Sequence, residues 1–341
     1  MTTKVAVLGA GSWGTAVAAI AARNVPTTLW ARRPELAEHI ATTHVNADYL
    51  PAFRLPKKLK ATSSLEEALD EASVVVMGVP SHGFRTILDE AADHLPAGSP
   101  VISLTKGVEQ GSLKRMTEVI DEVLPGHCVG VLTGPNLAKE VMSGYPAGTV
   151  IAMSDMAVTA ELQPIFATDF FRVYTNPDVI GCEIAGALKN VMAIAAGIAD
   201  GMGFGDNTRA TLITRGLAEL SRLGCALGGQ PLTFSGLAGM GDLVATCISR
   251  QSRNRHVGEE LGRGRTIDEI VKEMNMVAEG VKTSKAVVEL AARVGVDMPI
   301  AEQVVAVLYE GKSAAEIVPP LMMRAAGAEM EGISRGPSLP G

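Results

Sequence analysis

The sequence predicts an α/β domain with a mostly parallel sheet, followed by a second domain made only of helices. Up to residue 178, short apolar runs alternate with segments of helical length, which is the pattern of consecutive β–α–β units. Beyond that point the strand-like runs stop and only helical patterns follow. A chain of 341 residues is also long enough for two domains of roughly 100–200 residues each.

The elements of both domains can be placed by their periodicity. Apolar runs are expected to form strands at 4–8, 27–30, 74–79, 101–104, 129–132, 148–153 and 170–174. Helices are expected between them at 13–23, 34–41, 65–71, 83–94, 112–123, 136–143 and 155–166. In the second half, helices are expected at 178–200, 208–228, 242–248, 253–262, 266–274, 281–294, 299–309 and 313–318. The expected domains are therefore 1–180 and 181–330, with a flexible tail at 331–341.

Composition and charge exclude several classes of function. With 30 Lys and Arg against 37 Asp and Glu, the net charge of −7 argues against nucleic acid or an anionic membrane surface as a partner. The cysteines form no C-x-x-C pair and the histidines form no cluster, so we expect no metal site and reduced thiols in the cytoplasm. The N-terminus lacks the features of a signal peptide. Glu183 and Lys189 interrupt the most apolar stretch, 179–199, so no membrane insertion is expected.

A glycine-rich turn directly follows the first predicted strand. Gly9, Gly11 and Gly14 form G-x-G-x-x-G, with Ser12 and Trp13 where a helix of small residues begins. In this motif the glycines allow a tight turn, close approach of the backbone to a pyrophosphate, and close packing of helix on strand. Free N–H groups at the helix start then face the phosphates. We therefore expect a Rossmann-type, dinucleotide-binding domain; the alternative is a purely structural turn.

The end of the second predicted strand indicates which dinucleotide binds. A site specific for NAD usually carries Asp or Glu here to hold the ribose 2′-hydroxyl. This chain has Arg32 and Arg33 instead, whose planar guanidinium groups suit a 2′-phosphate. NADPH is therefore the favoured cofactor, with NADH also possible. The alternative is that both arginines are solvated at a helix start, where cations oppose the helix dipole.

A single lysine interrupts a helix that is expected to be buried. Residues 179–199 are apolar nearly all round, and Lys189 has no carboxylate three or four positions away on the same helix. Burying an unpaired ammonium is costly, so another part of the chain must compensate its charge. The small neighbours leave room for a ligand, and a lysine in such a site can give and take a proton. The alternatives are a lysine that reaches solvent and one that pairs with a distant acid.

Further polar candidates lie at turns. Lys106 follows the strand at 101–104, at the end of the sheet where ligands bind in open α/β folds, although a surface lysine would look the same. Gly134 and Asn136 follow the next strand, in a loop that starts a helix, with Asn136 at a capping position. Asp242 follows a glycine-rich turn in the helical half and is poised to cap a helix, unless it takes part in the site.

A local anion site is indicated in the helical half. Ser252, Arg253 and Asn254 place a hydroxyl, a guanidinium and an amide in succession, and these groups are the donors that bind phosphate. The interval 243–258 contains three arginines, the last of them Arg255, and no acidic residue. The alternative is a plain basic surface. Nucleic-acid binding is disfavoured because no aromatic residue interleaves with the arginines.

Together these motifs resemble those of bacterial NAD(P)-dependent glycerol-3-phosphate dehydrogenases over residues 1–320. The matching segments are GAGSWGTA at 9–16, TKG at 105–107, GPNLAKE at 134–140, ALKNVMAIAAG at 187–197, GMGDLVATC at 239–247, QSRNR at 251–255 and VAEG at 277–280. The resemblance implies a Rossmann domain and a helical domain with the site in the cleft between them. It also implies reduction of dihydroxyacetone phosphate by NAD(P)H to sn-glycerol 3-phosphate, the backbone precursor of membrane phospholipids.

The same resemblance implies a role for each matching residue. Lys189 would be the general acid and base, Asp242 would orient either this lysine or the substrate hydroxyl, and Lys106 would contact both substrate and cofactor. Cofactor contacts would come from Gly9, Gly11, Ser12, Trp13, Gly14, Arg32, Arg33, Tyr49, Ala138, Arg253, Val277 and Glu279. The substrate phosphate would be held by Ser252, Arg253 and Asn254, helped by Gly134 and Asn136. Many relatives have Ser or Thr in place of Asn136, whose amide can still donate a hydrogen bond.

Two other functions fit part of this pattern. A ketopantoate reductase or a β-hydroxyacid dehydrogenase has a similar architecture but gives no role to the donors at 252–254. A non-enzymatic NADP-sensing protein gives no role to Lys189 in its apolar helix. The partner expected for an enzyme is a small phosphorylated substrate, and the apolar helical half favours a homodimer.

Overall fold

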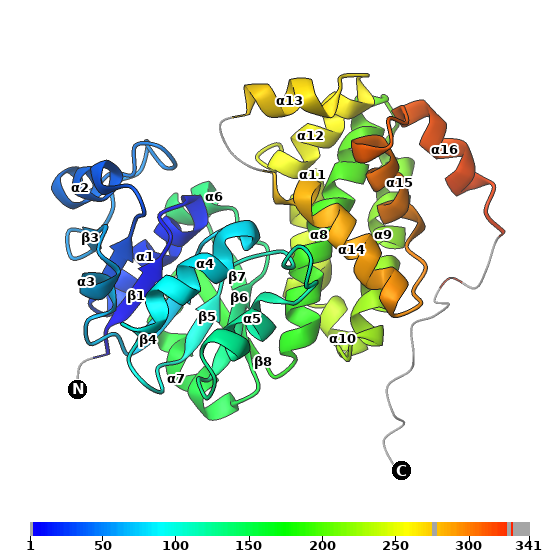
Figure 1. Ribbon diagram of the computed structural model, residues 1–341. Helices are drawn as coiled ribbons and strands as arrows, with labels where there is room; N and C mark the ends of the chain where they lie inside the picture. Colours follow the sequence, from blue (N-terminus) through cyan, green and yellow to red (C-terminus); the bar gives the residue numbers. More distant parts are fainter. Residues whose placement is uncertain (1–2, 275–277, 326–328, 330–341) are drawn as a thin grey trace, which may run out of the picture. The chain divides into compact units, whose positions relative to one another are not determined.

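The computed structural model describes residues 3–274, 278–325 and 329, and its chain divides into two compact units (Figure 1). Unit 1 comprises Met1–Thr105 and Lys114–Val179, and unit 2 comprises Lys106–Leu113 and Ile180–Gly341. The segment Lys106–Leu113 carries no sequence pattern that assigns it to unit 2, yet its Val108 and Leu113 are buried in the core of that unit. The predicted tail at 331–341 lies outside the described residues.

Unit 1 contains an eight-stranded sheet in the order β3-β2-β1-β4-β5-β6-β7-β8. The strands are β1 (Val5–Leu8), β2 (Thr27–Trp30), β3 (Lys60–Thr62), β4 (Val74–Met77), β5 (Val101–Ser103), β6 (Val129–Thr133), β7 (Ala147–Met153) and β8 (Phe171–Asn176). Every neighbouring pair is parallel except β6 and β7, so the prediction of a mostly parallel sheet is confirmed. Strand β3 is not predicted from sequence, because it is short and has no apolar run.

Helices cover both faces of this sheet, as consecutive β–α–β units require. They are α1 (Ser12–Asn24), α2 (Pro34–Thr43), α3 (Leu65–Leu69), α4 (Ser81–Ala92), α5 (Met116–Val123), α6 (Ala138–Met142) and α7 (Met156–Phe166). Along β1 the side chains alternate: Val5 and Val7 join the apolar cluster that includes α1 and α7, whereas Ala6 and Leu8 join the cluster that includes α4 and α5. With both faces covered, ligands reach this sheet at the carboxyl ends of its strands.

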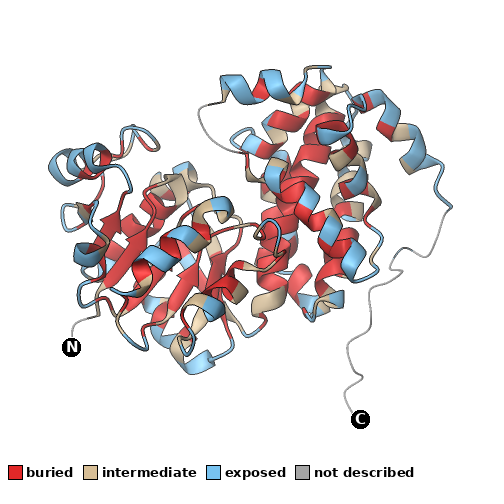
Figure 2. Ribbon diagram, in the orientation of Figure 1, coloured by how far each residue is buried: buried red, intermediate tan, exposed pale blue. Residues whose placement is uncertain are grey.

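Unit 2 is built around α8 (Val179–Gly201), which is buried along almost its whole length (Figure 2). The other helices are α9 (Asp206–Ala226), α10 (Pro231–Phe234), α11 (Asp242–Ile248), α12 (Arg253–Gly262), α13 (Ile267–Glu273), α14 (Glu279–Arg293), α15 (Pro299–Tyr309) and α16 (Ala314–Met322). A π-helical turn, Leu237–Gly241, precedes α11. The short α10 and the π-turn are not predicted from sequence. Helices are the only regular elements among the described residues of unit 2, as predicted.

Two helical stretches, Val179–Gly201 and Pro231–Ile248, are long and apolar enough to cross a membrane by composition alone. In the first, 89% of the apolar window is buried inside the structure, and in the second 44% is buried. An all-round apolar helix inside a folded unit is a core helix, so the composition of α8 is explained by its place in unit 2.

Helices α8 and α12 touch along their backbones. A Cβ added to Gly197 of α8 would lie 2.1 Å from the carbonyl oxygen of Arg255, and one added to Gly258 of α12 would lie 2.0 Å from that of Ile194. One turn further along, Gly201 and Gly262 repeat the same close approach. Only glycine fits at these positions, and the contact fixes α12 against the C-terminal third of α8.

Candidate active site

The glycine-rich turn of unit 1 has the geometry that a pyrophosphate requires. Gly9 has a φ of +123°, and a Cβ there would lie 2.5 Å from the carbonyl oxygen of Gly78. A Cβ on Gly14 would lie 2.0 Å from the carbonyl oxygen of Gly9, whereas a Cβ on Gly11 would meet no atom within 4 Å. Gly11 is the N-cap of α1, and no side chain accepts hydrogen bonds from the first N–H groups of this helix at that position. A ligand can therefore reach these N–H groups.

The first turn of α1 also holds an unsatisfied donor. The buried indole N–H of Trp13, next to Ser12, has no hydrogen-bond partner among the described residues. The ring packs edge-on against Phe171, with 6.3 Å between ring centroids. A buried donor without a partner costs free energy unless a ligand or water satisfies it. This turn therefore fits a bound dinucleotide in both its backbone and its side chains.

The two arginines at the end of β2 differ in their surroundings. Both are exposed, but Arg33 forms an ion pair with Asp48, in the loop between α2 and β3. Arg32 forms no ion pair among the described residues. Tyr49 follows Asp48 and is half-buried. The sequence shows no acid at the end of β2, and the structure brings one there from 15 residues away.

Three charged side chains meet in unit 2. The Nζ of Lys189, in the middle of α8, lies 2.9 Å from Oδ1 of Asp242, and the Nζ of Lys106 lies 2.5 Å from Oδ2 of the same carboxylate. The side chains are 8%, 14% and 3% exposed for Lys189, Lys106 and Asp242 respectively. Lys189 therefore pairs with an acid distant in sequence. The alternative that Asp242 caps a helix is wrong, since Gly241 is the N-cap of α11.

Thr246 of α11 forms hydrogen bonds with two members of this cluster, Lys189 and Asp242. Its hydroxyl accepts a hydrogen bond from Nζ of Lys189 at 2.6 Å and donates to the carbonyl oxygen of Asp242 at 2.7 Å. Burial lowers the pKa of Lys106 to about 8; the carboxylate of Asp242 opposes this shift and the charge of Lys189 adds to it. Two cations share the carboxylate of Asp242, and the carboxyl group of Glu279 also interacts electrostatically with both lysines.

A chain of amides connects this cluster to α12 and α14. The amide of Asn190 donates to the carbonyl oxygen of Lys106 at 3.4 Å, and its Oδ1 accepts from Nδ2 of Asn254 at 2.9 Å. The Oδ1 of Asn254 in turn accepts from the backbone N–H of Gly280 at 3.0 Å. A Cβ on Gly280 would lie 2.7 Å from the carbonyl oxygen of Asn190, so glycine is required there. These bonds place the start of α14 against the middle of α8.

The remaining candidates of unit 2 lie around the same helix starts. Ser252 is the N-cap of α12 and accepts a hydrogen bond from the N–H of Arg255 at 3.2 Å, while Arg253 is exposed. Glu279 begins α14; burial raises the pKa of its carboxyl, and the charges of Arg253, Lys189 and Lys106 oppose this rise. Val277 lies outside the described residues.

The basic patch predicted at 243–258 is smaller than expected. Arg255 forms ion pairs with Asp200 of α8 at 2.6 Å and with Glu259 at 3.2 Å. A count of acidic residues within 243–258 includes neither partner, because Asp200 lies on α8 and Glu259 lies one residue past the interval. The guanidinium of Arg255 therefore serves packing of α12 on α8 and is not a candidate anion ligand.

In unit 1, Asn136 is tied to the neighbouring strand. Its amide donates to the carbonyl oxygen of Gly148 at 3.1 Å, and its Oδ1 accepts from the hydroxyl of Thr149 at 2.9 Å. The N-cap of α6 is Leu137, so the prediction that Asn136 caps this helix is wrong; Ala138 is the first helical residue. Gly134 has a φ of +147°, which favours glycine in this loop.

Comparison with known proteins decides the family. A family model described as NAD-dependent glycerol-3-phosphate dehydrogenase N-terminus matches residues 4–159, and the model of the C-terminus matches residues 178–319. The chain belongs to the NAD-dependent glycerol-3-phosphate dehydrogenase family. A curated glycerol-3-phosphate dehydrogenase (NAD(P)+) 2 from Sphingopyxis alaskensis is 56% identical over 96% of this chain and 99% of its own. One from Mycobacterium avium is 52% identical over 96% of this chain and 97% of its own.

Solved structures agree with this membership of the glycerol-3-phosphate dehydrogenase family. A glycerol-3-phosphate dehydrogenase from Coxiella burnetii has a TM-score of 0.91 and 36% identity, covering 95% of this chain and 99% of its own. A ketopantoate reductase from Ralstonia eutropha has a TM-score of 0.60 at 19% identity, covering 94% of this chain and 100% of its own, which shows a shared fold alone. The predicted fold class is confirmed, and the ketopantoate reductase alternative is not favoured.

The sequence patterns do not identify several polar residues that lie near Lys189, Lys106 and Asp242. Thr246 and Asn190 contact Lys189 and Lys106 directly, but a threonine in a short helix and an asparagine beside a lysine carry no distinctive pattern. Asp48 was also missed, because its partner Arg33 is distant in sequence. No group of three His, Cys, Asp or Glu residues suited to a metal ion occurs in the described part of the chain.

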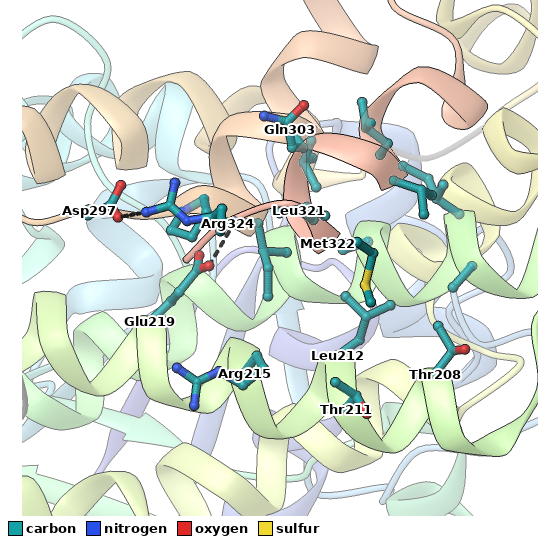
Figure 3. A pocket seen from close by; sticks show the side chains of 18 of the residues that line it. Thr208, Thr211, Leu212, Arg215, Glu219, Asp297, Gln303, Leu321, Met322 and Arg324 are labelled. Carbon is teal, nitrogen blue, oxygen red and sulfur yellow. Dashed lines mark hydrogen bonds and ion pairs between the residues drawn. The ribbon is translucent and has the colours of Figure 1, made fainter. Parts of the chain in front are cut away.

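A separate cavity of about 1180 Å³ lies in unit 2, lined by α8, α9, α15 and α16, and none of the predicted site residues lines it. Figure 3 shows its more polar end, where the charged side chains gather, and an opposite end where Leu212 and Met322 lie beside Thr208 and Thr211. The polar end has Glu219, whose carboxylate accepts from the N–H groups of Ile300 at 2.7 Å and Ala301 at 3.3 Å, at the start of α15. Burial raises the pKa of Glu219 to about 7, against the effect of these hydrogen bonds and of Arg222.

Stability is expected to depend on pH through Glu219. Between its ordinary pKa of 4.5 and about 7, the folded chain binds more protons than the unfolded chain, so the free energy of unfolding falls as pH rises. The whole shift corresponds to about 3 kcal/mol. Glu219→Gln cannot ionise and should lose this fall in urea unfolding across that range, whereas Glu310→Gln, at an exposed site, should keep it. An equal pH slope in Glu219→Gln and the unmodified chain would contradict the assignment.

Proposed function

We propose that this chain catalyses the reversible, NAD(P)H-dependent reduction of dihydroxyacetone phosphate to sn-glycerol 3-phosphate, which supplies the backbone of glycerophospholipids. The observation that carries this proposal is the pair of lysines, the buried Lys189 and the partly buried Lys106, on the single carboxylate of Asp242. Two ammonium groups side by side suit a ketone oxygen as it becomes an alkoxide. Membership of the glycerol-3-phosphate dehydrogenase family supports the same substrate.

Lys189 is assigned the proton transfer. Its ammonium has three N–H bonds, and Asp242 and Thr246 are acceptors for two of them, at 2.9 and 2.6 Å. The third can donate to the ketone oxygen, which takes up this proton during reduction. In the reverse direction the neutral amine accepts the hydroxyl proton. Asp242 and Thr246 hold Nζ of Lys189 in place, so this side chain is already oriented when the proton is transferred.

When bound, the nicotinamide cofactor supplies the hydride, and the chain's part is to bind and orient it. In unit 1 the residues assigned to it are Gly9, Gly11, Ser12, Trp13, Gly14, Arg32, Arg33, Tyr49 and Ala138. In unit 2 they are Lys106, Arg253 and Glu279, together with Val277. The open backbone at Gly11 and the unsatisfied indole of Trp13 support the unit 1 assignment.

The substrate phosphate is assigned to Ser252, Arg253 and Asn254, with Gly134 and Asn136 as further contacts. The first turn of α12 has no acidic residue, so its N–H groups and the exposed guanidinium of Arg253 form a positive helix start. One amide hydrogen of Asn254 is used by Asn190, and one of Asn136 by Gly148. Each amide therefore has one further hydrogen to offer a phosphate.

Activity is expected to fall as pH rises through about 8, the pKa of Lys106. Below this pH the ammonium attracts the oxygens of the substrate, and above it the neutral amine does not. We expect Lys106→Arg, which stays charged, to move this fall to higher pH, with kcat/KM for dihydroxyacetone phosphate as the measurement. Lys272→Arg, on the surface of α13, should keep the profile of the unmodified chain. A profile that is unchanged in Lys106→Arg would contradict the role of Lys106.

One assay separates the proposed activity from its competitors. NADPH absorbance is followed after addition of dihydroxyacetone phosphate, of unphosphorylated dihydroxyacetone, or of ketopantoate, each at the same concentration. Rapid oxidation with the first and little with the others supports the proposal. Faster oxidation with ketopantoate would assign a different reductase. NADPH binding without oxidation by any of the three ketones would favour a sensor.

We further propose that the protein is a cytoplasmic homodimer. Large apolar side chains of unit 2 are exposed, including Leu232 at 86% and Met323 at 84%, and such side chains favour self-association. Light scattering on the purified protein should give twice the mass of the chain, and a monomeric mass would contradict the dimer.

A further inference from the structure

The ion pair between Arg33 and Asp48 lies at the place where a Rossmann site distinguishes NADPH from NADH. Arg33 is the N-cap of α2, directly after β2, and Asp48 lies in the loop that leads from α2 toward β3. Their side chains are 54% and 44% exposed, so both can reach a ligand. Arg32 beside them is exposed as well. Two guanidinium groups and one carboxylate therefore stand together at the end of β2.

The loop that contains Asp48 is hydrogen-bonded to the glycine-rich turn and to α1 through Asn46. Asn46 is fully buried, and its amide donates to the carbonyl oxygen of Ala10 at 2.9 Å and to the hydroxyl of Thr15 at 2.8 Å. Its Oδ1 accepts from the N–H of Tyr49 at 3.2 Å. These three bonds fix the backbone on either side of Asp48 against the turn and the first helix. The position of Asp48 is thus set by the phosphate-binding turn, unlike that of an ordinary surface acid.

A carboxylate at this place acts oppositely on the two cofactors. It can accept a hydrogen bond from the ribose 2′-hydroxyl of NADH, which is the usual role of an acid at the end of this strand. Toward the 2′-phosphate of NADPH it is a like charge, and it also occupies the guanidinium that the phosphate would use. Arg32 and Arg33 favour the phosphate. The cluster as a whole therefore offers a partner to either cofactor.

We propose that Asp48 is a specificity-determining residue that lets this site use NADH alongside NADPH, by accepting from the 2′-hydroxyl of NADH and by competing with the 2′-phosphate of NADPH for Arg33. This rests on the proposed function, since it assumes that the glycine-rich turn binds the cofactor. Asp48 thus takes the place of the acid that is missing from the end of β2. It lies in a loop after α2, whereas the usual sequence pattern places this acid at the end of the strand.

The test is the cofactor preference of Asp48→Asn. We expect the ratio of kcat/KM for NADPH to that for NADH to rise about tenfold, through a loss with NADH and no loss with NADPH, since a hydrogen bond to a charged group is removed. Asp48→Ala should give the same direction. Glu38→Gln, which removes an exposed acid further along α2 without breaking an ion pair, should leave the ratio unchanged.

Binding measured without turnover separates this proposal from the proposed function. Calorimetric titration of each variant with NADPH and with NADH gives the two Kd values even if no ketone is reduced. A shift of their ratio toward NADPH in Asp48→Asn supports the role of Asp48. An unchanged ratio, or equal losses with both cofactors, would overturn it, the second result meaning that Asp48 only supports the loop.

Discussion

Replacing Lys189 with methionine is expected to lower kcat about 10³-fold, because the proton donor to the ketone oxygen is lost. Methionine matches the apolar stem of lysine and fits a helix, so α8 should still fold. Asp242 keeps one cation, Lys106, and is not left buried without a partner. Cofactor affinity should persist, since the glycine-rich turn belongs to the other unit of the chain.

Two measurements check this result. Initial rates with dihydroxyacetone phosphate and NADPH give kcat, and calorimetric titration with NADPH gives the affinity. Lys272→Met, on the exposed side of α13, serves as the matched control and should turn over normally. Near-normal turnover in Lys189→Met would remove this lysine from the mechanism, and the proton would then have to come from elsewhere.

Replacing Gly258 with alanine is expected to destabilise unit 2 by about 3 kcal/mol or more. The new Cβ would lie 2.0 Å from the carbonyl oxygen of Ile194, a backbone atom that no rotamer change can move away. Helices α8 and α12 would have to separate, and the same movement would strain the packing at Gly197, Gly201 and Gly262. Lys189 lies on α8 and Ser252 is the N-cap of α12, so activity should fall together with stability.

Urea unfolding measures this cost. Gly83→Ala, inside α4, is the control, because its Cβ would meet no atom within 4 Å and alanine favours a helix. We expect the control to be neutral or slightly stabilised. If Gly258→Ala unfolded at the same urea concentration as the unmodified chain, the close contact of the two helices could not be essential to the fold.

The fold follows closely from local sequence patterns, whereas the site follows from them only in part. Buried parallel strands and an all-round apolar helix have local signatures, so the sheet and α8 could be predicted. Strand β3 has none, because it is short and half-polar. The turn at 9–14 was predictable because all its functional atoms lie in one stretch of chain.

Partners that are distant in sequence could not be predicted from the residues themselves. Lys189 visibly lacks a partner on its own helix, but nothing in its surroundings names Asp242; only the resemblance to a family did so. The pairing of Arg255 with Asp200 and that of Arg33 with Asp48 had no local signal either. The distribution of charges along the sequence therefore predicts more free arginines at 250–255 than the structure has. It also gives no sign of the acid, Asp48, that pairs with Arg33.

The excursion of Lys106–Leu113 into unit 2 has a consequence for dissecting the chain. The polypeptide passes from one unit to the other at Thr105, at Leu113 and again at Val179, so no single cut separates them. A fragment starting at residue 181 would lack Lys106, the second cation on Asp242, together with Val108 and Leu113 of its core. Unit 2 is thus discontinuous in the sequence, and it is complete only when the first half of the chain contributes Lys106–Leu113 to it.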